Sequence, residues 1–134
     1  MSAMVKVSVI IPVYNVAPYL GECLDSVIQQ SLKDIEIVCV DDCSTDNSSF
    51  LLKKYAESDI RIRLFYNERN RDLSFTRNRG LKESCGEYVF FLDSDDALYD
   101  NEVLKELYII AEQDDAELVS GRTVNWFPDE SGKE

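Results

Sequence analysis

Short runs of apolar, often β-branched residues alternate with segments of helical periodicity along this chain. The runs predict five strands, at residues 5–11, 35–40, 62–66, 88–92 and 118–124. Apolar residues at helical spacing predict four helices, at residues 20–28, 47–58, 74–84 and 103–111. This alternation is typical of βαβ units, whose right-handed crossovers place helices on both faces of a parallel sheet. We therefore expect an α/β fold with a mostly parallel open sheet, and we expect Pro12 to end the first strand because it has no N–H to donate.

Length and charge limit the classes of protein to which the chain can belong. Its 134 residues suffice for one domain, which we place at residues 1–124, followed by an acidic tail or continuation at residues 125–134. The net charge of −12 argues against a nucleic-acid backbone or an anionic membrane surface as the main partner. The sequence has no histidine, so any chemistry must depend on carboxylates rather than on the usual zinc ligand or general base.

The cysteines indicate a reducing location. None of the four forms a Cys-x-x-Cys pair, and Cys23 and Cys39 are expected to be small buried residues of a helix and a strand. The N-terminus does not resemble a signal peptide, and no apolar stretch approaches the roughly 20 residues needed to cross a bilayer. The expected location is the cytosol.

The strand-to-helix loops of a parallel sheet all lie at one edge, and open α/β sheets bind their ligands at that edge. Four such loops are expected to meet there, at residues 12–15, 41–44, 67–73 and 93–96. They carry acidic, basic and aromatic side chains. The sequence therefore predicts a binding site at this edge of the sheet.

The most conspicuous of these loops is acidic. Residues 89–92 form a wholly apolar run, predicted to be a buried strand, that leads directly into Asp93, Ser94, Asp95 and Asp96. Carboxylates packed this closely repel one another unless a cation lies between them. Their hard oxygen atoms suit Mg²⁺ or Mn²⁺, with the phosphates of a substrate completing the shell. The alternative interpretation is a polar turn, because Asp and Ser also favour turns and helix N-caps.

Three further side chains at this edge are candidates for ligand binding. Asp42 is predicted to face the rim and accept hydrogen bonds from a ligand, whereas Asp46 or Asn47 is expected to cap the next helix. Tyr14 offers a flat face on which a base could stack, although an aromatic residue here could also pack on a helix. Arg77 is expected in the first turn of its helix, where free N–H groups favour phosphate and a guanidinium would bind a diphosphate bidentately.

Four ordered motifs, spread from residue 5 to about residue 121, resemble those of the family 2 glycosyltransferases of GT-A fold. They are residues 7–15 (VSVIIPVYN), 40–46 (VDDCSTD), 76–80 (TRNRG) and 91–96 (FLDSDD). Cys43 stands where the family more often has glycine, a departure that is not expected to affect ligand contacts.

The resemblance implies a Rossmann-like nucleotide-binding fold that transfers a sugar, with inversion, from a nucleotide diphosphate-sugar to an acceptor hydroxyl. The nucleotide-sugar site that it implies consists of Pro12, Tyr14, Asn15, Asp41, Asp42, Arg77, Asp93, Ser94 and Asp95. In this site Tyr14 would stack on the base, Asp42 would accept its ring N–H and Arg77 would approach the diphosphate. A UDP-sugar is the donor expected first, although the motifs determine neither the base nor the sugar.

The resemblance also implies a divalent metal, Mn²⁺ or Mg²⁺. Asp95 would be the central residue of the Asp-x-Asp metal motif, with Asp93 and Asp96 contacting ribose or metal. The metal would act as a Lewis acid on the leaving diphosphate. The catalytic base of the family comes from the second half of its domain, so we expect the base and the pocket for a saccharide or lipid-linked acceptor outside this chain. The complete protein is expected in the cytoplasm, free or at the inner face of the membrane, in the synthesis of cell-envelope polysaccharide.

Three alternatives stay open at this point. A haloacid dehalogenase-type phosphohydrolase also has Asp-x-Asp after a strand, but it needs a Ser or Thr, a Lys and further acids that the residues after Asp93 do not supply. A phosphoacceptor receiver domain needs its acidic pair after the first strand and a Lys after the fifth. Here the first strand leads into Pro12, Val13, Tyr14 and Asn15, and no Lys follows the predicted fifth strand until Lys133. A nucleotide-sugar-binding module without turnover would have the same motifs.

Overall fold

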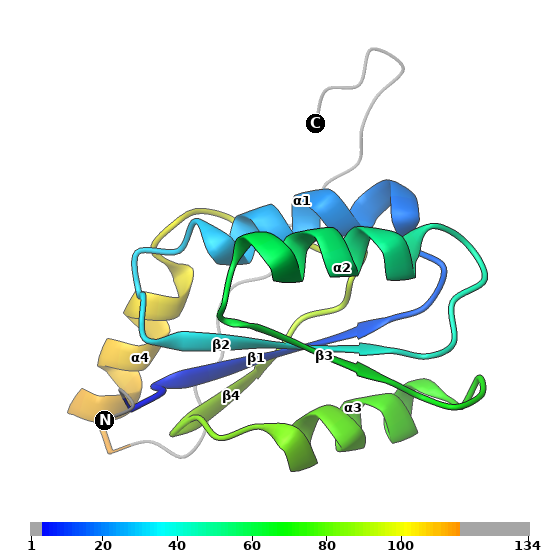
Figure 1. Ribbon diagram of the computed structural model, residues 1–134. Coiled ribbons are helices and arrows are strands. Elements are labelled where there is room, and N and C mark those ends of the chain that lie inside the picture. The colour runs from blue at the N-terminus through cyan, green and yellow to red at the C-terminus, as the bar shows by residue number, and fades with distance from the viewer. Residues whose placement is uncertain (1–3, 116–134) are drawn as a thin grey trace.

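Four parallel strands form a sheet with helices on both faces, as predicted (Figure 1). The computed structural model describes residues 4–115. The strands lie in the order β3-β2-β1-β4 and are β1 (Val7–Val13), β2 (Ile35–Asp41), β3 (Ile62–Tyr66) and β4 (Tyr88–Phe91). The helices are α1 (Ala17–Ile28), α2 (Ser48–Ser58), α3 (Leu73–Glu83) and α4 (Val103–Gln113). The predicted strand 118–124 and the tail 125–134 lie outside the described residues.

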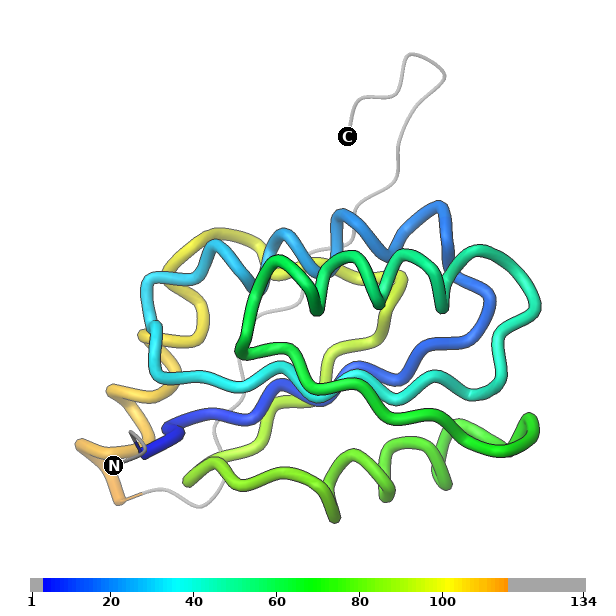
Figure 2. The backbone as a smooth tube through the Cα atoms, viewed as in Figure 1, coloured from blue at the N-terminus to red at the C-terminus, as the bar shows by residue number. Residues whose placement is uncertain are grey.

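The sheet buries apolar side chains on both of its faces. Val9 and Ile11 of β1 belong to the larger core, which includes apolar residues of α1, α2 and α4. Ile10 points the other way and forms a smaller core with Val38 and Val40 of β2. Figure 2 shows the same division, with α1 and α2 on one side of the sheet and α3 on the other. Among the helices that the structure describes in residues 4–115, none is long and apolar enough to cross a membrane.

Helix α3 packs directly on the sheet because Gly80 has no side chain. A Cβ atom at Gly80 would lie 2.4 Å from Cγ2 of Ile10 and 3.5 Å from Cγ2 of Val40. Any larger residue would therefore push the helix away from the sheet. This close contact places the start of α3, including the buried Thr76, beside the carboxyl ends of β1 and β2.

The first strand continues beyond Pro12, and the prediction that this residue would end it is wrong. The carbonyl of Ile10 accepts a hydrogen bond from Leu92 N on the β4 side. Pro12 is two residues further along, so its backbone faces the same side. The pairing of β4 with β1 ends at Phe91, opposite Ile10. The missing N–H therefore lies past the end of the β4 ladder, where the sheet does not need it.

One prediction of burial is also wrong. The apolar run 89–92 is not a fully buried strand, because Phe91 is 46% exposed. The physical reason is that β4 is an edge strand of the described sheet, paired with β1 alone. In α2, Phe50 is 58% exposed and Leu52 is fully buried. The ring of Phe50 instead lies 5.2 Å from the ammonium group of Lys54.

The prediction for the cysteines is confirmed. Cys23 and Cys39 are fully buried, and all four cysteines are free. Burial, with a smaller contribution from nearby carboxylates, raises the pKa of the Cys23 thiol to about 12. Both core cysteines therefore act as small apolar residues.

Candidate functional site

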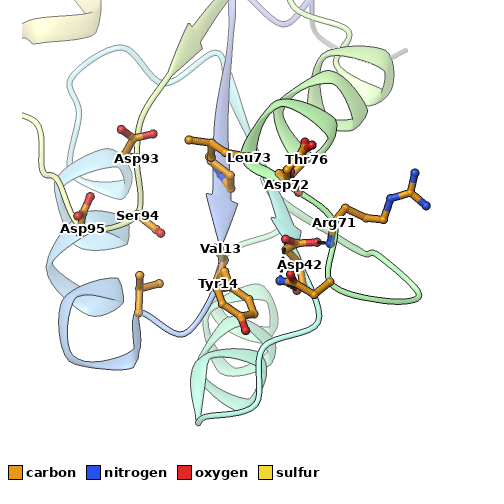
Figure 3. A pocket seen from close by; sticks show the side chains of 13 residues that line it. Val13, Tyr14, Asp42, Arg71, Asp72, Leu73, Thr76, Asp93, Ser94 and Asp95 are labelled. Carbon is orange, nitrogen blue, oxygen red and sulfur yellow. Dashed lines mark hydrogen bonds between the residues drawn. The ribbon is translucent and has the colours of Figure 1, made fainter.

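A pocket of about 400 Å³ opens at the carboxyl ends of the strands. It is lined by Pro12, Val13, Tyr14, Val16, Asp42, Asn70, Arg71, Asp72, Leu73, Thr76, Asp93, Ser94 and Asp95. These residues come from the end of β1, from the loops after β1, β2, β3 and β4, and from the start of α3. The parallel topology predicts that these loops meet at one edge. Figure 3 shows Asp93 and Asp95 on one side of the pocket and Asp42 and Thr76 on the other.

The pocket brings together six of the nine residues predicted for nucleotide-sugar binding. Those six are Pro12, Tyr14, Asp42, Asp93, Ser94 and Asp95. The other three, Asn15, Asp41 and Arg77, are not among its lining residues. The division follows from the hydrogen bonds that each side chain makes.

Asn15 and Asp41 hold the loops of the site in place. The amide oxygen of Asn15 accepts hydrogen bonds from Thr45 N at 2.8 Å and Asp46 N at 3.3 Å, so it joins the loop after β1 to the loop after β2. Its φ of 50° lies in the left-handed region, which Asn tolerates better than most residues. Asp41 is buried, and its carboxylate accepts from Ser44 N and from the hydroxyl of Ser49 at the start of α2.

Asp42 organises the pocket wall on the side of α3. Its carboxylate is nearly buried and accepts from Arg71 N at 2.7 Å, Asn67 Nδ2 at 2.8 Å and Asn70 Nδ2 at 3.1 Å. These three bonds fix the polar loop after β3 against β2. Asp42 thus faces the pocket, as predicted, but its oxygen atoms already have protein donors.

Helix capping divides between the two residues predicted for it. Asn47 occupies the N-cap position of α2 but makes no side-chain capping bond. Asp46 Oδ1 accepts from Ser48 N at 2.9 Å, and its Oδ2 accepts from Ala17 N at the start of α1. Asp46 therefore accepts a hydrogen bond from a backbone N–H at the start of both α1 and α2.

The start of α3 contributes pocket residues that the sequence analysis did not single out. Asp72 is the N-cap of α3, and its Oδ1 accepts from Phe75 N at 2.7 Å. Thr76 Oγ1 donates to Asp72 O and accepts from Asn67 Nδ2. The guanidinium of Arg71 lies 4.0 Å from the ring centroid of Phe75. An Asp just before the start of a predicted helix is a typical N-cap residue. The sequence therefore contained a signal that could have identified Asp72.

The carboxylates of Asp93, Asp95 and Asp96 form a compact cluster. One oxygen atom from each lies within 4.8 Å of the others. Partial burial, followed by the charges of Asp95 and Asp93, raises the pKa of the Asp96 carboxyl above its ordinary value. Three carboxylate oxygen donors this close together fit a hard divalent cation such as Mg²⁺ or Mn²⁺. These residues begin a segment without helix or strand, residues 93–102, which we call the acidic loop.

Arg77 contacts the cluster rather than a helix terminus. It is the fifth residue of α3, so its predicted place in the first turn is wrong, because the helix begins at Leu73. Its Nη2 donates to Asp93 Oδ1 at 2.7 Å. Its buried Nε has no hydrogen-bond partner among the described residues. One cation therefore already offsets part of the negative charge of the cluster.

Comparisons with known proteins agree with the sequence motifs. The model of the family described as Glycosyl transferase family 2 matches residues 8–134. Glycosyltransferase GlyA of Streptococcus pneumoniae is 53% identical over 91 residues, which are 68% of this chain and 13% of that protein.

Two solved structures with bound nucleotide sugars share the fold. TarS of S. aureus in complex with UDP-GlcNAc has a TM-score of 0.75 and 33% identity, over 90% of this chain and 37% of that one. Mannosyltransferase PcManGT from Pyrobaculum calidifontis, in complex with GDP-Man and Mn²⁺, has a TM-score of 0.70 and 29% identity. That match covers 77% of this chain and 31% of the mannosyltransferase. The chain thus spans well under half the length of each of these proteins.

Proposed function

Because this chain belongs to glycosyl transferase family 2, we propose that its pocket binds the nucleotide diphosphate-sugar donor of a sugar-transfer reaction. Residues 1–124 would form the donor half of the enzyme. The carboxylate that activates the acceptor hydroxyl would come from a part of the relatives' length that this chain does not span. The phosphohydrolase and receiver-domain alternatives are set aside, because the family match and the structural neighbours are glycosyltransferases.

The observation that carries this proposal is the division of the pocket into two chemically different ends. Tyr14 is 46% exposed at the end of β1 and presents an aromatic face, and Asp42 lines the same pocket. Asp93 and Asp95 lie at the other end, with three carboxylates within 4.8 Å. A base suits the aromatic end, and a diphosphate with its metal suits the acidic end.

The chain's own residues would each have a limited task. Tyr14 would stack on the base, and Asp42 would accept its ring N–H by exchanging one of its loop donors. Asp95 would be the central metal ligand, with Asp93 and Asp96 contacting the metal or ribose. A bound Mn²⁺ or Mg²⁺ would supply Lewis-acid stabilisation of the leaving diphosphate. Arg77 would release Asp93 and approach the diphosphate, since a guanidinium binds phosphate oxygens well.

The donor is a nucleoside diphosphate sugar, and a UDP-sugar is the first choice. The solved neighbours carry UDP-GlcNAc in one case and GDP-Man with Mn²⁺ in the other, which supports the class of donor rather than one base. Transfer would proceed with inversion to a saccharide or lipid-linked acceptor, in the cytoplasm or at the inner face of the membrane. Synthesis of cell-envelope polysaccharide is the process that such a reaction would serve.

Thermal unfolding tests the proposal directly. The whole chain is heated with UDP, GDP, ADP and CDP in turn, each with Mn²⁺ and again with EDTA. A ligand at about 100 times its Kd adds about 2.7 kcal/mol, which raises the Tm of a domain of this size by several degrees. We expect a metal-dependent shift with one diphosphate, which also identifies the base. A cooperatively folded chain whose Tm responds to none of them would contradict the proposal.

A further inference from the structure

Polar residues at the end of α1 fasten the acidic loop at several points. Ser26 Oγ accepts from Leu98 N at 3.0 Å, and Ser31 N donates to Asn101 O at 2.8 Å. The loop has no helix or strand of its own between residues 93 and 102. Its conformation therefore depends on these contacts with α1.

Gln30 is the central contact of this set. Its side chain is fully buried, directly after the C-cap of α1. Its Nε2 donates to the carbonyl oxygens of Asp100 and Ser26, and its Oε1 accepts from Leu104 N at 3.0 Å. Both amide hydrogens and the amide oxygen are thus used inside the protein.

The bond to Leu104 N also explains how α4 begins. Leu104 is the second residue of α4, and its N–H is one of the groups that a helix cannot satisfy internally. Glu102, the N-cap residue, makes no side-chain capping bond. Gln30 supplies the missing acceptor from the segment that follows α1, so it joins the end of the acidic loop to the start of α4.

We propose that Gln30 is a positioning residue for the acidic cluster: it fixes the far end of the acidic loop so that Asp93, Asp95 and Asp96 are held together before a divalent cation binds. The proposal rests on the function proposed above, because it assigns Gln30 to the metal site of that function. Three carboxylates within 4.8 Å repel one another, so a loop free at its far end would spread. Residues that orient metal ligands from outside the coordination shell typically contribute about 10–100-fold to metal affinity.

Gln30→Met tests the proposal, because methionine keeps the length of the side chain and removes all three hydrogen bonds. Mn²⁺ affinity of the whole chain is measured by electron paramagnetic resonance at a temperature where the variant is fully folded. We expect the Kd for Mn²⁺ to rise about tenfold. Ser26→Ala, which removes the acceptor for Leu98 N at smaller structural cost, is expected to change the Kd in the same direction.

Tyr55→Phe is the matched control. Tyr55 Oη donates to Asp25 Oδ1 at 2.9 Å, so this variant also removes a polar contact of α1 but leaves the acidic loop untouched. Its Mn²⁺ affinity is expected to equal that of the wild type. Hydrogen exchange adds a second readout: Gln30→Met should accelerate exchange of the amides of Leu98 and Leu104, while the amide of Val38 in the sheet keeps its protection.

The outcomes separate the two proposals. If the wild type binds Mn²⁺ and Gln30→Met binds it equally well, the positioning role is wrong and the donor-binding function stands. The positioning role would also be overturned if Tyr55→Phe lost the same affinity for Mn²⁺, or if Gln30→Met accelerated exchange equally throughout the sheet. Gln30 would then contribute only to the general stability of the fold. If the wild type itself binds no Mn²⁺, the metal site of the proposed function fails, and the role of Gln30 fails with it.

Discussion

Arg77 Nη2 donates to Asp93 Oδ1 over 2.7 Å, so α3 contacts the acidic cluster through a direct ion pair. The two side chains are 36% and 44% exposed, and an ion pair in such surroundings stabilises the fold by about 1 kcal/mol or less. Its consequence is therefore electrostatic rather than structural. The guanidinium is paired with one of the three carboxylates that would bind a metal ion.

Replacing Arg77 should change the affinities for metal and for nucleotide in opposite directions. In Arg77→Leu, Asp93 loses its protein cation, so Mn²⁺ alone should bind more tightly because the cluster is more negative. UDP in the presence of Mn²⁺ should bind less tightly, because a diphosphate ligand loses a guanidinium worth about 1.5–3 kcal/mol. Titration calorimetry measures both Kd values. Arg69→Leu, an exposed arginine of the neighbouring loop, is the control for charge, and movement of both Kd values in the same direction in Arg77→Leu would contradict the assignment.

Asp95→Ala should abolish metal-dependent nucleotide binding and leave the fold intact. Removing one of three mutually repelling charges lowers the electrostatic repulsion in the metal-free protein, so its Tm should stay the same or rise slightly. Thermal unfolding with Mn²⁺ and UDP should then show no ligand-induced shift. Glu57→Ala on the exposed side of α2 removes the same charge far from the cluster and should keep the full shift. A normal shift in Asp95→Ala would refute the metal assignment.

Tyr14→Ala should weaken the binding of the base by about 1–3 kcal/mol, the usual magnitude of lost stacking. Tyr14→Phe keeps the ring and should keep the affinity, because stacking depends on the aromatic face rather than on the hydroxyl. Tyr19→Ala, which removes another exposed tyrosine, serves as the control. Fluorescence titration with a nucleoside diphosphate and with inorganic pyrophosphate separates binding of the base from binding of the diphosphate. Equal losses for both ligands would mean that Tyr14 does not stack on the base.

The parts of this site that the sequence predicts are those that depend on strand order. Parallel topology alone places Tyr14, Asp42 and Asp93 at one edge, because each follows a strand directly. The direction of individual side chains needs more information. Asp41 and Asp42 are neighbours of the same type, yet only the contacts with Ser44 and Ser49 reveal that Asp41 turns toward α2.

The buried face of α2 also depends on how the helix packs on the sheet. Phe50 and Leu52 are both apolar, but Phe50 is 58% exposed and Leu52 is fully buried. At Pro12 the general cost of a missing N–H does not apply, because β4 is short and its pairing with β1 ends at Phe91, opposite Ile10. The role of Gln30 could not be predicted, because its two partners in the acidic loop and in α4, Asp100 and Leu104, lie about 70 residues further along the chain.

Glu36 should make the stability of the fold depend on pH. Its side chain is nearly buried at the opposite end of the sheet from the pocket, where its carboxylate accepts from Ser8 Oγ at 2.6 Å, Cys85 N at 2.7 Å and Arg63 Nη1 at 2.8 Å. Burial alone would raise the pKa of this carboxyl, but the hydrogen bonds from Ser8, Cys85 and Arg63 hold its pKa below the ordinary 4.5. A pKa that is lower in the folded state stabilises the protein above the unfolded value, and this stabilisation is lost as the pH falls through the folded value.

Glu36→Gln should therefore lower the free energy of unfolding by about 1–3 kcal/mol at neutral pH, because three donors, among them the buried hydroxyl of Ser8, lose a charged acceptor. The difference from the wild type should shrink as the pH falls from 4.5 through the lower pKa of the folded state, because the wild-type carboxyl then becomes neutral, like the amide. Urea unfolding of both chains across this range measures the difference, with Glu68→Gln in the exposed loop after β3 as the control. If the difference in the free energy of unfolding stays constant through the acid range, the charge of Glu36 is not its cause. Glutamine would then destabilise the fold through its different shape.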